Sequence, residues 1–349
     1  MSDPNTHART EEPLIEVKDL VKEFPITKGS SRKVTGTVRA VNHVGISIRR
    51  GEILGLVGES GCGKTTTGRC IMRAIEPTSG HVLVRFDGGE PKDLLAMGQG
   101  ELIRTRTNMR LVFQDPYSSL NPRMRVADIV KEVLLLNGTV KGRREMDERV
   151  AVTLERVGLN RDQMGLYPHA FSGGQRQRIA IARALVSEPR FVVADEPVSA
   201  LDVSIQAQIL NLLIGLKREM DLTILFIAHN LAVVAHACDR IAVMYLGEIV
   251  ELAGSDALNT APRHPYTEAL LSAVPEPDPR KKRPRITLTG EIGDLSDLPS
   301  GCAFHPRCRY AKDVCRKEKP PLEETAVPGA DSHLAACHFA RELKLEGCR

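Results

Sequence analysis

One short glycine-rich motif constrains the fold of this 349-residue chain more than any other feature. Residues 58–65 read GESGCGKT and fit the pattern G-x-x-x-x-G-K-[ST], after the apolar run EILGLV and before the helical run TTTGRCIMRAI. Glycines in such a loop let backbone N–H groups close around phosphate oxygens, while the lysine neutralises the β and γ phosphates and the hydroxyl binds magnesium. The sequence therefore predicts a nucleotide-binding α/β fold, and a glycine-rich turn without a ligand is the weaker interpretation.

Length and charge exclude several classes of protein. At about 100 to 200 residues per domain, the chain has room for one large domain and a smaller one. Because 48 Lys and Arg stand against 44 Asp and Glu, the net charge of +4 gives no overall attraction for nucleic acid. Every apolar run is shorter than the roughly 20 residues that span a membrane, and the polar N-terminus lacks a secretory signal. We therefore expect a cytosolic protein.

Apolar spacing divides the chain into regions of different character. Residues 14–258 alternate short β-rich runs with helical stretches, which is typical of a mostly parallel sheet covered by helices. Within that region, residues 115–188 show few β runs and a helical spacing, which predicts an inserted helical subdomain. Proline and charged residues dominate from residue 259, and residues 274–285 have the composition of a linker. We therefore expect a small C-terminal extension over residues 259–349.

An apolar strand that ends in two carboxylates is the second candidate for chemistry. Residues 191–196 read FVVADE. At the end of such a strand, Asp195 can hold the magnesium shell, and Glu196 can orient and deprotonate a water molecule that attacks the γ phosphate. A strand end of this kind is usually only solvated, but beside a phosphate-binding loop the catalytic interpretation is favoured.

A third candidate is the run FSGGQRQR at residues 171–178, which opens the helical run IAIARAL. A serine and two glycines at the start of a helix expose N–H groups at the positive end of the helix dipole, and that arrangement can bind an anion. An ordinary N-cap explains the same residues equally well.

Together these motifs resemble the nucleotide-binding subunit of an ATP-binding cassette (ABC) transporter. GESGCGKTT looks like its Walker A motif, VVADE like its Walker B motif, and FSGGQ like its signature. Gln114 in VFQDP resembles the Q-loop, residues 199–202 (SALD) the D-loop, and His229 in IAHN the switch histidine. Phe24 resembles the aromatic residue that stacks on adenine. The resemblance implies a P-loop ABC cassette, with a mixed sheet and a helical insertion, followed by a Cys-containing C-terminal extension.

The resemblance also implies a role for each matched position, with ATP and Mg²⁺ as cofactors. The residues expected to bind ATP are Phe24, Gly58, Glu59, Ser60, Gly61, Cys62, Gly63, Lys64, Thr65 and Thr66. Those expected to act in hydrolysis are Glu196, His229 and Gln114, and those expected around Mg²⁺ are Thr65, Gln114 and Asp195. Those expected to contact ATP on a partner subunit are Ser172, Gly173, Gly174 and Gln175. Asp202 is expected in the D-loop.

In that family the signature of one subunit closes over the Walker A motif of another, so the resemblance implies that this chain works in a pair. The runs FQDPYSSLNP (113–122) and HPYT (264–267) resemble those of dipeptide and oligopeptide (or nickel) importers. Such importers usually pair two different cassettes. The implied partners are therefore a paralogous ATPase subunit, two transmembrane permease subunits and an extracytoplasmic peptide-binding protein, with no nucleic acid. The chain would lie at the cytoplasmic face of the inner membrane, held there by the permeases.

A soluble ABC ATPase that acts on DNA or ribosomes is the alternative function. Cassettes of that class usually carry two nucleotide domains in one chain, a long coiled-coil or zinc insertion, or a strongly basic surface, and the sequence shows none of these features. A non-catalytic nucleotide binder is a third possibility, against which Glu196 and His229 argue.

Five of the eight cysteines fall within the last 48 residues. Four of them, separated by 5, 6 and 21 residues, are Cys302, Cys308, Cys315 and Cys337. This spacing matches neither a zinc ribbon nor a compact ferredoxin pattern, although four thiolates can still converge on one group. The resemblance implies a 4Fe-4S cluster, which would staple a Pro-rich segment rather than carry electrons. Zinc bound with help from His305, His333 or His338, or simply reduced thiols, are the alternatives.

Overall fold

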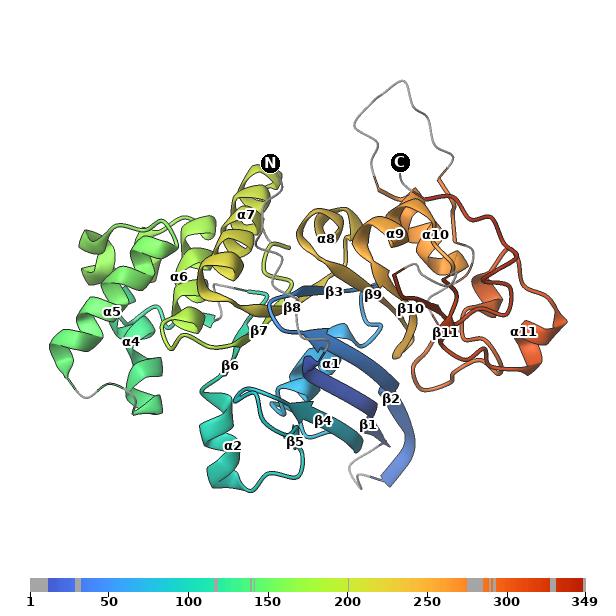
Figure 1. The fold of residues 1–349 in the computed structure, drawn as a ribbon, viewed down its shortest axis with the longest axis horizontal. Coiled ribbons are helices and arrows are strands. Elements are labelled where there is room, and N and C mark those ends of the chain that lie inside the picture. The colour runs from blue at the N-terminus through green and yellow to red at the C-terminus, as the bar shows by residue number, and fades with distance from the viewer. Residues whose placement is uncertain are drawn as a thin grey trace. The chain divides into compact units, whose positions relative to one another are not determined.

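The computed structural model describes residues 12–28, 33–115, 119–138, 140, 142–199, 201–274, 285–288, 290, 293–326 and 331–347. The chain divides into two compact units. Unit 1 comprises Met1–Glu16, Ser47–Glu52 and Leu83–Leu225, and unit 2 comprises Val17–Ile46, Ile53–Val82 and Phe226–Arg349. The chain therefore passes several times from one unit to the other (Figure 1, coloured from the N-terminus to the C-terminus).

The regular elements alternate along the chain. The strands are β1 (Pro13–Lys28), β2 (Lys33–Arg49), β3 (Ile53–Val57), β4 (Ser79–Val84), β5 (Lys92–Asp93), β6 (Met109–Val112), β7 (Phe191–Asp195), β8 (Thr223–Ala228), β9 (Arg240–Tyr245), β10 (Glu248–Gly254), β11 (Glu323–Glu324) and β12 (His333–Ala335). The helices of at least five residues are α1 (Lys64–Ile71), α2 (Gln99–Arg106), α4 (Val126–Asn137), α5 (Arg143–Arg156), α6 (Gly173–Leu185), α7 (Val203–Met220), α8 (Leu231–Ala237), α9 (Ser255–Thr260), α10 (Pro265–Ser272), α11 (Asp313–Lys317) and the 3-10 helix η1 (Arg161–Gly165).

The core of unit 2 is a mixed sheet with the strand order β11-β12-β10-β9-β3. Strand β3 runs parallel to β9, and β9, β10, β12 and β11 follow one another in antiparallel pairs. Every residue of β3 is buried, as expected of a short, continuous apolar strand covered on both faces. The turn from β9 to β10 uses Leu246 and Gly247, both at positive φ, which is the two-residue turn that matches the twist of a hairpin.

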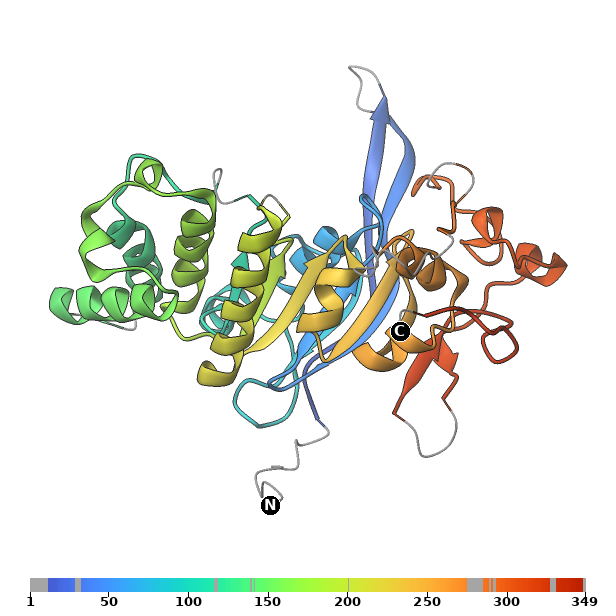
Figure 2. The ribbon, with the colours of Figure 1, turned by 90° about the horizontal axis from the view of Figure 1, so that it is seen from above.

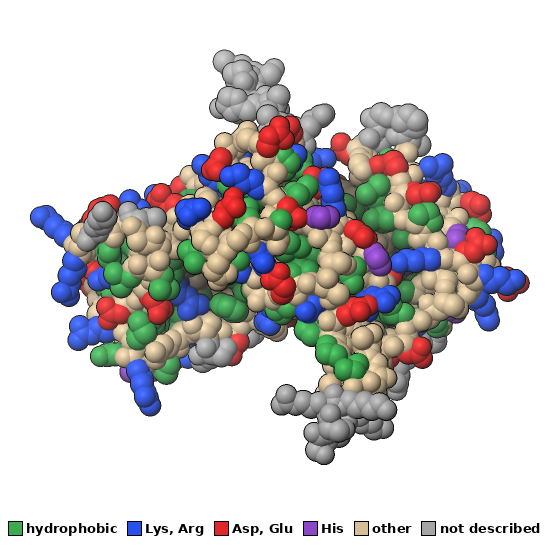
Figure 3. Space-filling model, turned by 90° about the horizontal axis from the view of Figure 1, so that it is seen from below, with side chains coloured by type: hydrophobic (Ala, Val, Ile, Leu, Met, Phe, Trp, Pro, Cys, Tyr) green, Lys and Arg blue, Asp and Glu red, His purple; other side chains and the backbone are tan. Residues whose placement is uncertain are grey.

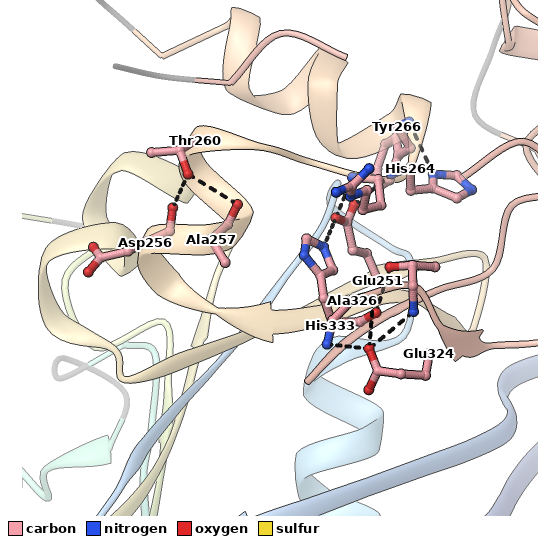
Figure 4. A network of polar contacts seen from close by, with 11 residues as sticks. Glu251, Asp256, Ala257, Thr260, His264, Tyr266, Glu324, Ala326 and His333 are labelled. Atoms are coloured by element: carbon pink, nitrogen blue, oxygen red, sulfur yellow. Dashed lines mark hydrogen bonds and ion pairs between the residues drawn. The ribbon is translucent and has the colours of Figure 1, made fainter. Parts of the chain in front are cut away.

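The C-terminal extension joins this sheet by adding strands to its edge. Strand β12 pairs with β10 so that Glu251 faces Ala335, and β11 pairs in turn with β12. The carboxylate of Glu251 is fully buried, where it accepts the backbone N–H groups of Arg263 and His264 and lies 2.7 Å from Nε2 of His333 (Figure 4). The extension is therefore attached to the sheet through both its backbone and the buried contact of His333 with Glu251.

Unit 2 also holds most of a second sheet, in which β1 lies between β2 and β4. The sequence analysis identified no strands over residues 13–49, although their pattern is visible in retrospect. In β2, Val44, Ile46 and Ile48 are buried while the residues between them are exposed or half-buried, which is the two-residue period of a strand with one covered face.

In unit 1, β6 runs parallel to β7 with Met109 opposite Phe191. Helices α4, α5 and α6 pack against one another, as Figures 1 and 2 both show. The buried residues of α4 are Val126, Ile129, Val130 and Leu134, whose spacing places them on one face of the helix. These helices come from the part of the sequence in which helical spacing dominates.

No helix of the described residues combines the length and the apolar character that crossing a membrane requires. On the face shown in Figure 3, Lys and Arg side chains are interspersed with Asp and Glu. Among the described residues of that face, neither sign of charge forms an extended patch.

Candidate nucleotide-binding site

The glycine-rich loop, which we define as residues 58–66, comprises the connection from β3 to α1 and the first residues of α1, all in unit 2. Gly58 has φ of 158° and Gly63 has φ of 106°. A Cβ atom at Gly63 would lie 2.0 Å from the carbonyl oxygen of Ala40, and one at Gly58 would lie 2.2 Å from that of Met244. Only glycine allows this loop to approach the neighbouring backbone so closely, which explains why the motif requires glycine at these two positions.

Lys64 lies at the centre of the loop. Its side chain is almost fully buried, and Nζ donates hydrogen bonds of 2.8 Å to the carbonyl oxygens of both Gly58 and Glu59. The hydroxyl of Thr67 donates to the carbonyl oxygen of Gly63 at 3.0 Å, which closes the first turn of α1. The loop thus curls around one ammonium group at a helix N-terminus, and this arrangement is suited to binding phosphate.

Neither cysteine near the loop is a candidate nucleophile. Burial raises the pKa of the Cys62 thiol and raises that of Cys70 to about 11. Both side chains therefore remain protonated thiols at neutral pH, and they act as small apolar residues in the core.

Unit 2 also carries two other expected site residues. His229 directly follows the last residue of β8 and is exposed, and Asn230 caps α8 by accepting the N–H of Ala232. The ring of Phe24 is partly exposed on β1, with the ammonium of Lys22 at 4.9 Å from its centroid. Both side chains are accessible to a ligand.

In unit 1, adjacent parallel strands bring two of the expected catalytic residues together. Strands β6 and β7 end side by side, and Nε2 of Gln114 donates to Oε2 of Glu196 at 3.0 Å. Asp195, the last residue of β7, is 1% exposed. Ligands of α/β proteins bind at the carboxyl ends of parallel strands, which is where this cluster lies.

The backbone at Glu196 is unusual. Its φ of 45° lies in the left-handed region, which non-glycine residues rarely occupy outside turns and functional sites. Both the N–H and the hydroxyl of Ser199 donate to the Glu196 carbonyl oxygen and so hold this conformation. The turn aims the carboxylate at Gln114.

The run FSGGQ forms a capping box at the start of α6. Ser172 Oγ accepts the N–H of Gln175, and Gln175 Oε1 accepts the N–H of Ser172. A Cβ atom at Gly174 would lie 2.6 Å from Cγ2 of Ile205 on α7, so this glycine allows close helix packing. The N-cap interpretation is therefore confirmed, and the exposed Ser172 remains compatible with an anion site.

Asp202 is exposed and precedes the first residue of α7, while Ala200 lies outside the described residues. Residues 116–118 of the run FQDPYSSLNP also lie outside them. Unit 2 thus carries the glycine-rich loop, Phe24 and His229, and unit 1 carries Gln114, Asp195, Glu196, Asp202 and residues 172–175.

Two residues at the glycine-rich loop were missed by the sequence analysis. The hydroxyl of Tyr266 accepts the N–H of Glu59 at 2.9 Å, and the guanidinium of Arg307 donates to both carboxylate oxygens of Glu59, at 2.6 and 3.1 Å. They lie 207 and 248 residues from Glu59 along the chain, so no local pattern could have revealed either contact.

The structure brings the four tail cysteines around one small cavity in unit 2. Its lining includes Cys302, Cys308, Cys315 and Cys337, together with aromatic side chains such as Phe304 and Phe339. Burial raises the pKa of Cys302 to about 11 and that of Cys337 to about 12. Cys302 and Cys337 are therefore protonated thiols at neutral pH, and a metal group bound to them would have to displace these protons.

The histidines of the zinc alternative already have partners. One ring nitrogen of His305 contacts the carbonyl oxygen of Cys302, one of His333 contacts Glu251, and one of His338 contacts the carbonyl oxygen of Glu318. Among the residues that the structure describes, no group of three or more His, Cys, Asp or Glu side chains is placed to hold a metal ion.

Comparison with known proteins decides the family. The pattern described as "ABC transporter" matches residues 41–199, and that described as "Oligopeptide/dipeptide transporter, C-terminal region" matches residues 250–315. The chain is 48% identical over 335 residues to the oligopeptide transport ATP-binding protein AppF of Bacillus subtilis, and the match covers 95% of this chain and 99% of AppF. The chain belongs to the oligopeptide/dipeptide family of ABC transporter ATP-binding proteins.

Other relatives of this ABC ATP-binding protein agree. It is 49% identical over 325 residues to the probable peptide ABC transporter ATP-binding protein y4tS of Sinorhizobium fredii, covering 93% of this chain and 89% of that one. The ATP-binding cassette MJ0796, solved as a dimer bound to ADP and Pi, superposes with a TM-score of 0.60 at 27% identity, covering 69% of this chain and 98% of that one. CbiO1 of Clostridium perfringens superposes with a TM-score of 0.60 at 26% sequence identity, and the match covers 71% of this chain and 91% of CbiO1.

These matches confirm the expected α/β cassette fold with a mixed sheet. They give no support to the alternative of a soluble ATPase that acts on DNA or ribosomes. Apart from Phe24, which lies within β1, the site residues expected from the family resemblance lie in the glycine-rich loop, at or just after the ends of strands, or at helix starts.

Proposed function

We propose that this ABC ATP-binding protein hydrolyses Mg²⁺-ATP to power the import of di- or oligopeptides through a membrane transporter. The observation that carries the proposal is the contact of Gln114 with Glu196 at the ends of β6 and β7, in a chain that aligns with AppF over nearly its whole length. Hydrolysis needs a carboxylate that orients water next to a group that responds to the γ phosphate, and this pair supplies both.

Each expected site residue has a proposed role. The glycine-rich loop and Lys64 hold the phosphates, and Phe24 stacks on adenine. Thr65, Gln114 and Asp195 would hold Mg²⁺, which supplies charge neutralisation at the β and γ phosphates. Glu196 takes the proton from the attacking water, and His229 donates a hydrogen bond to a γ-phosphate oxygen.

Residues 172–175 would complete the ATP site of a second cassette, which we propose to be a paralogous subunit. Ser172 allows a sharp test because aspartate and asparagine both replace serine as an N-cap. Ser172→Asp keeps the cap but sets a negative charge against the partner's triphosphate, whereas Ser172→Asn keeps the cap without charge. We expect the first variant to lose ATP turnover in the assembled pair and the second to retain most of it. Equal turnover in the two variants would contradict the pairing.

A groove in unit 1 is the site at which we propose that a membrane subunit docks. It is lined by Arg110, Leu111, Phe113, Ser119, Glu132, Val133, Arg183 and Ala184. The side chain of Phe113 is 40% exposed and directly precedes Gln114. A helical segment of a permease seated here would therefore be next to a residue that contacts the catalytic carboxylate. This contact would hold the chain at the cytoplasmic face of the membrane.

The docking proposal has a matched control. Phe113→Glu places a charge in the groove, whereas Ile103→Glu places one at an apolar side chain that is 57% exposed on α2, outside the groove. We expect only the first to abolish co-purification with the permease subunits. Loss of co-purification in both variants, or in neither, would contradict the assignment of the groove.

We also propose that Cys302, Cys308, Cys315 and Cys337 would hold a 4Fe-4S cluster. Four cysteines around one cavity are the donor set of such a cluster. When bound, it would cross-link the parts of the extension that carry these cysteines. An anaerobic preparation should contain iron and inorganic sulfide and lose both in Cys315→Ser. Cys238→Ser, at a buried cysteine outside the cavity, should keep them. An iron-free wild type would contradict the proposal.

The function itself is tested with the transporter assembled in proteoliposomes. The complete assembly should take up a labelled oligopeptide only with ATP, and peptide-loaded binding protein should stimulate ATP turnover. Stimulation by ribosomes or DNA in place of that protein would favour the alternative ATPase.

A further inference from the structure

The glycine-rich loop of this protein is gripped by residues that lie beyond the ordinary nucleotide motifs. Resting on the ATP-binding role proposed above, we propose that Tyr266 and Arg307 are positioning residues that fix the loop at Glu59, so that the C-terminal region of the chain sets the affinity for ATP. Neither residue is expected to touch the nucleotide. Each acts through Glu59, the second residue of the loop.

Glu59 is held from three sides. Its N–H donates to the Tyr266 hydroxyl, its carboxylate receives both arms of the Arg307 guanidinium, and its carbonyl oxygen accepts from Lys64 Nζ. The Arg307 side chain is only 7% exposed, and a bidentate guanidinium–carboxylate pair is both stronger and more directional than a single neutral hydrogen bond. These contacts restrict the loop from Gly58 to Lys64 to one conformation.

The residues that grip the loop are themselves fixed by packing. Tyr266, Tyr245 and Phe304 are buried, with ring centroids 4.7 to 5.3 Å apart. The guanidinium carbon of Arg307 lies 5.9 Å from the Tyr245 ring centroid. Since Arg307 lies in the short helical turn His305–Arg307 of the extension, movement of the extension would reach the loop directly.

A buried polar chain fixes Tyr266 from the other side (Figure 4). Nδ1 of His264 accepts the N–H of Tyr266 and caps α10, and the N–H of His264 donates to Glu251. Glu251 in turn contacts His333 on β12. Burial lowers the pKa of His264 to about 3, so its imidazole is neutral at physiological pH and can accept this hydrogen bond. The extension therefore supports the loop through two routes, His333 and Arg307.

A loop that is already ordered binds ATP without first losing conformational entropy. The apparent Kd equals the intrinsic Kd divided by the fraction of molecules with a competent loop, so loosening the grip raises the Kd by the same factor. Hydrolysis of bound ATP should change little, because Glu196 and Gln114 are not altered. The expected signature is a raised KM for ATP with kcat maintained.

The test measures binding of a fluorescent ATP analogue to the full chain and ATP turnover in the assembled transporter. We expect Arg307→Ala and Glu59→Ala each to raise the Kd about tenfold, and the double variant to raise it no further because both changes break one pair. The control is Lys319→Ala, which breaks the ion pair of the extension with Glu248 without contacting the loop. It should leave the Kd unchanged.

Tyr266→Phe provides a second, conservative variant that keeps the ring and removes the hydroxyl from Glu59. It should raise the Kd severalfold while lowering the midpoint of thermal unfolding by only about 2 to 4 °C, so the variant stays folded and keeps the test valid if Arg307→Ala folds poorly. ATP affinities of Arg307→Ala and Tyr266→Phe equal to that of Lys319→Ala would overturn the inference. Absence of ATP binding in the wild type would instead overturn the proposed function.

Discussion

Gly63 offers the sharpest test of the loop geometry because a second glycine of the same loop serves as its control. Replacing Gly63 by alanine forces a side chain into a backbone with φ of 106° and places its Cβ 2.0 Å from the Ala40 carbonyl oxygen. Gly61 also has positive φ, at 81°, but no atom lies within 4 Å of its Cβ position. Gly61→Ala therefore has the conformational cost without the collision.

The two costs can be estimated separately. A non-glycine residue at positive φ costs about 1 to 2 kcal/mol. Displacing a packed backbone to make room for a methyl group costs about 1 to 3 kcal/mol more. Since each 1.4 kcal/mol is a factor of about ten, Gly61→Ala should weaken ATP binding by about tenfold and Gly63→Ala by about thirtyfold or more.

Titration with a fluorescent ATP analogue measures both affinities, and thermal unfolding of the same samples shows whether the fold is retained. Gly63→Ala is expected to bind more weakly than Gly61→Ala while both remain folded. Wild-type affinity in Gly63→Ala, or weaker binding by Gly61→Ala than by Gly63→Ala, would refute the argument that close backbone approach shapes the loop.

Three other predictions concern stability. Glu251→Ala should lower the free energy of unfolding by about 3 to 5 kcal/mol, because His333 and two N–H groups lose a buried partner. Urea unfolding of Glu251→Ala and Glu251→Gln, measured side by side, tests this prediction. A loss of stability in Glu251→Ala as small as that in Glu251→Gln would argue against the buried pair. Hydrogen bonds, chiefly from Ser332, lower the pKa of Glu324 to about 2, so its stabilising effect is present above about pH 4.5 and is lost as the pH falls towards 2. Glu324→Gln should therefore flatten the pH dependence of the unfolding midpoint in that range, and an unchanged slope would contradict the assignment. Gly174→Val should lower the unfolding midpoint because its side chain collides with Ile205, whereas an unchanged midpoint would show that α6 and α7 can separate at no cost.

The parts of the site that were predictable from sequence are those with a local signature. The loop at residues 58–66 combines fixed glycine spacing with a strand before it and a helix after it, and the apolar run 191–195 ends at its two carboxylates. Because neighbouring parallel strands end at the same edge, the meeting of Gln114 with Glu196 follows once both strands are placed.

The parts that escaped prediction depend on contacts between distant segments. Strand β12 has three residues and no periodicity of its own, and it is a strand only because β10 offers a partner. Arg307 lies in a Pro- and Cys-rich stretch that gives no hint of Glu59. At Ser172 the residues allowed two interpretations, and only the capping box showed which atoms the side chain contacts within its own helix.

The central proposal is that Glu196 takes the proton from the water molecule that attacks the γ phosphate of ATP. Glu196→Gln tests it directly, because the amide oxygen of glutamine can still accept from Gln114 while the group no longer takes a proton. Single-turnover release of phosphate from the assembled transporter should slow by about 10² to 10⁴, with the Kd for ATP unchanged. Release at the wild-type rate would contradict the account.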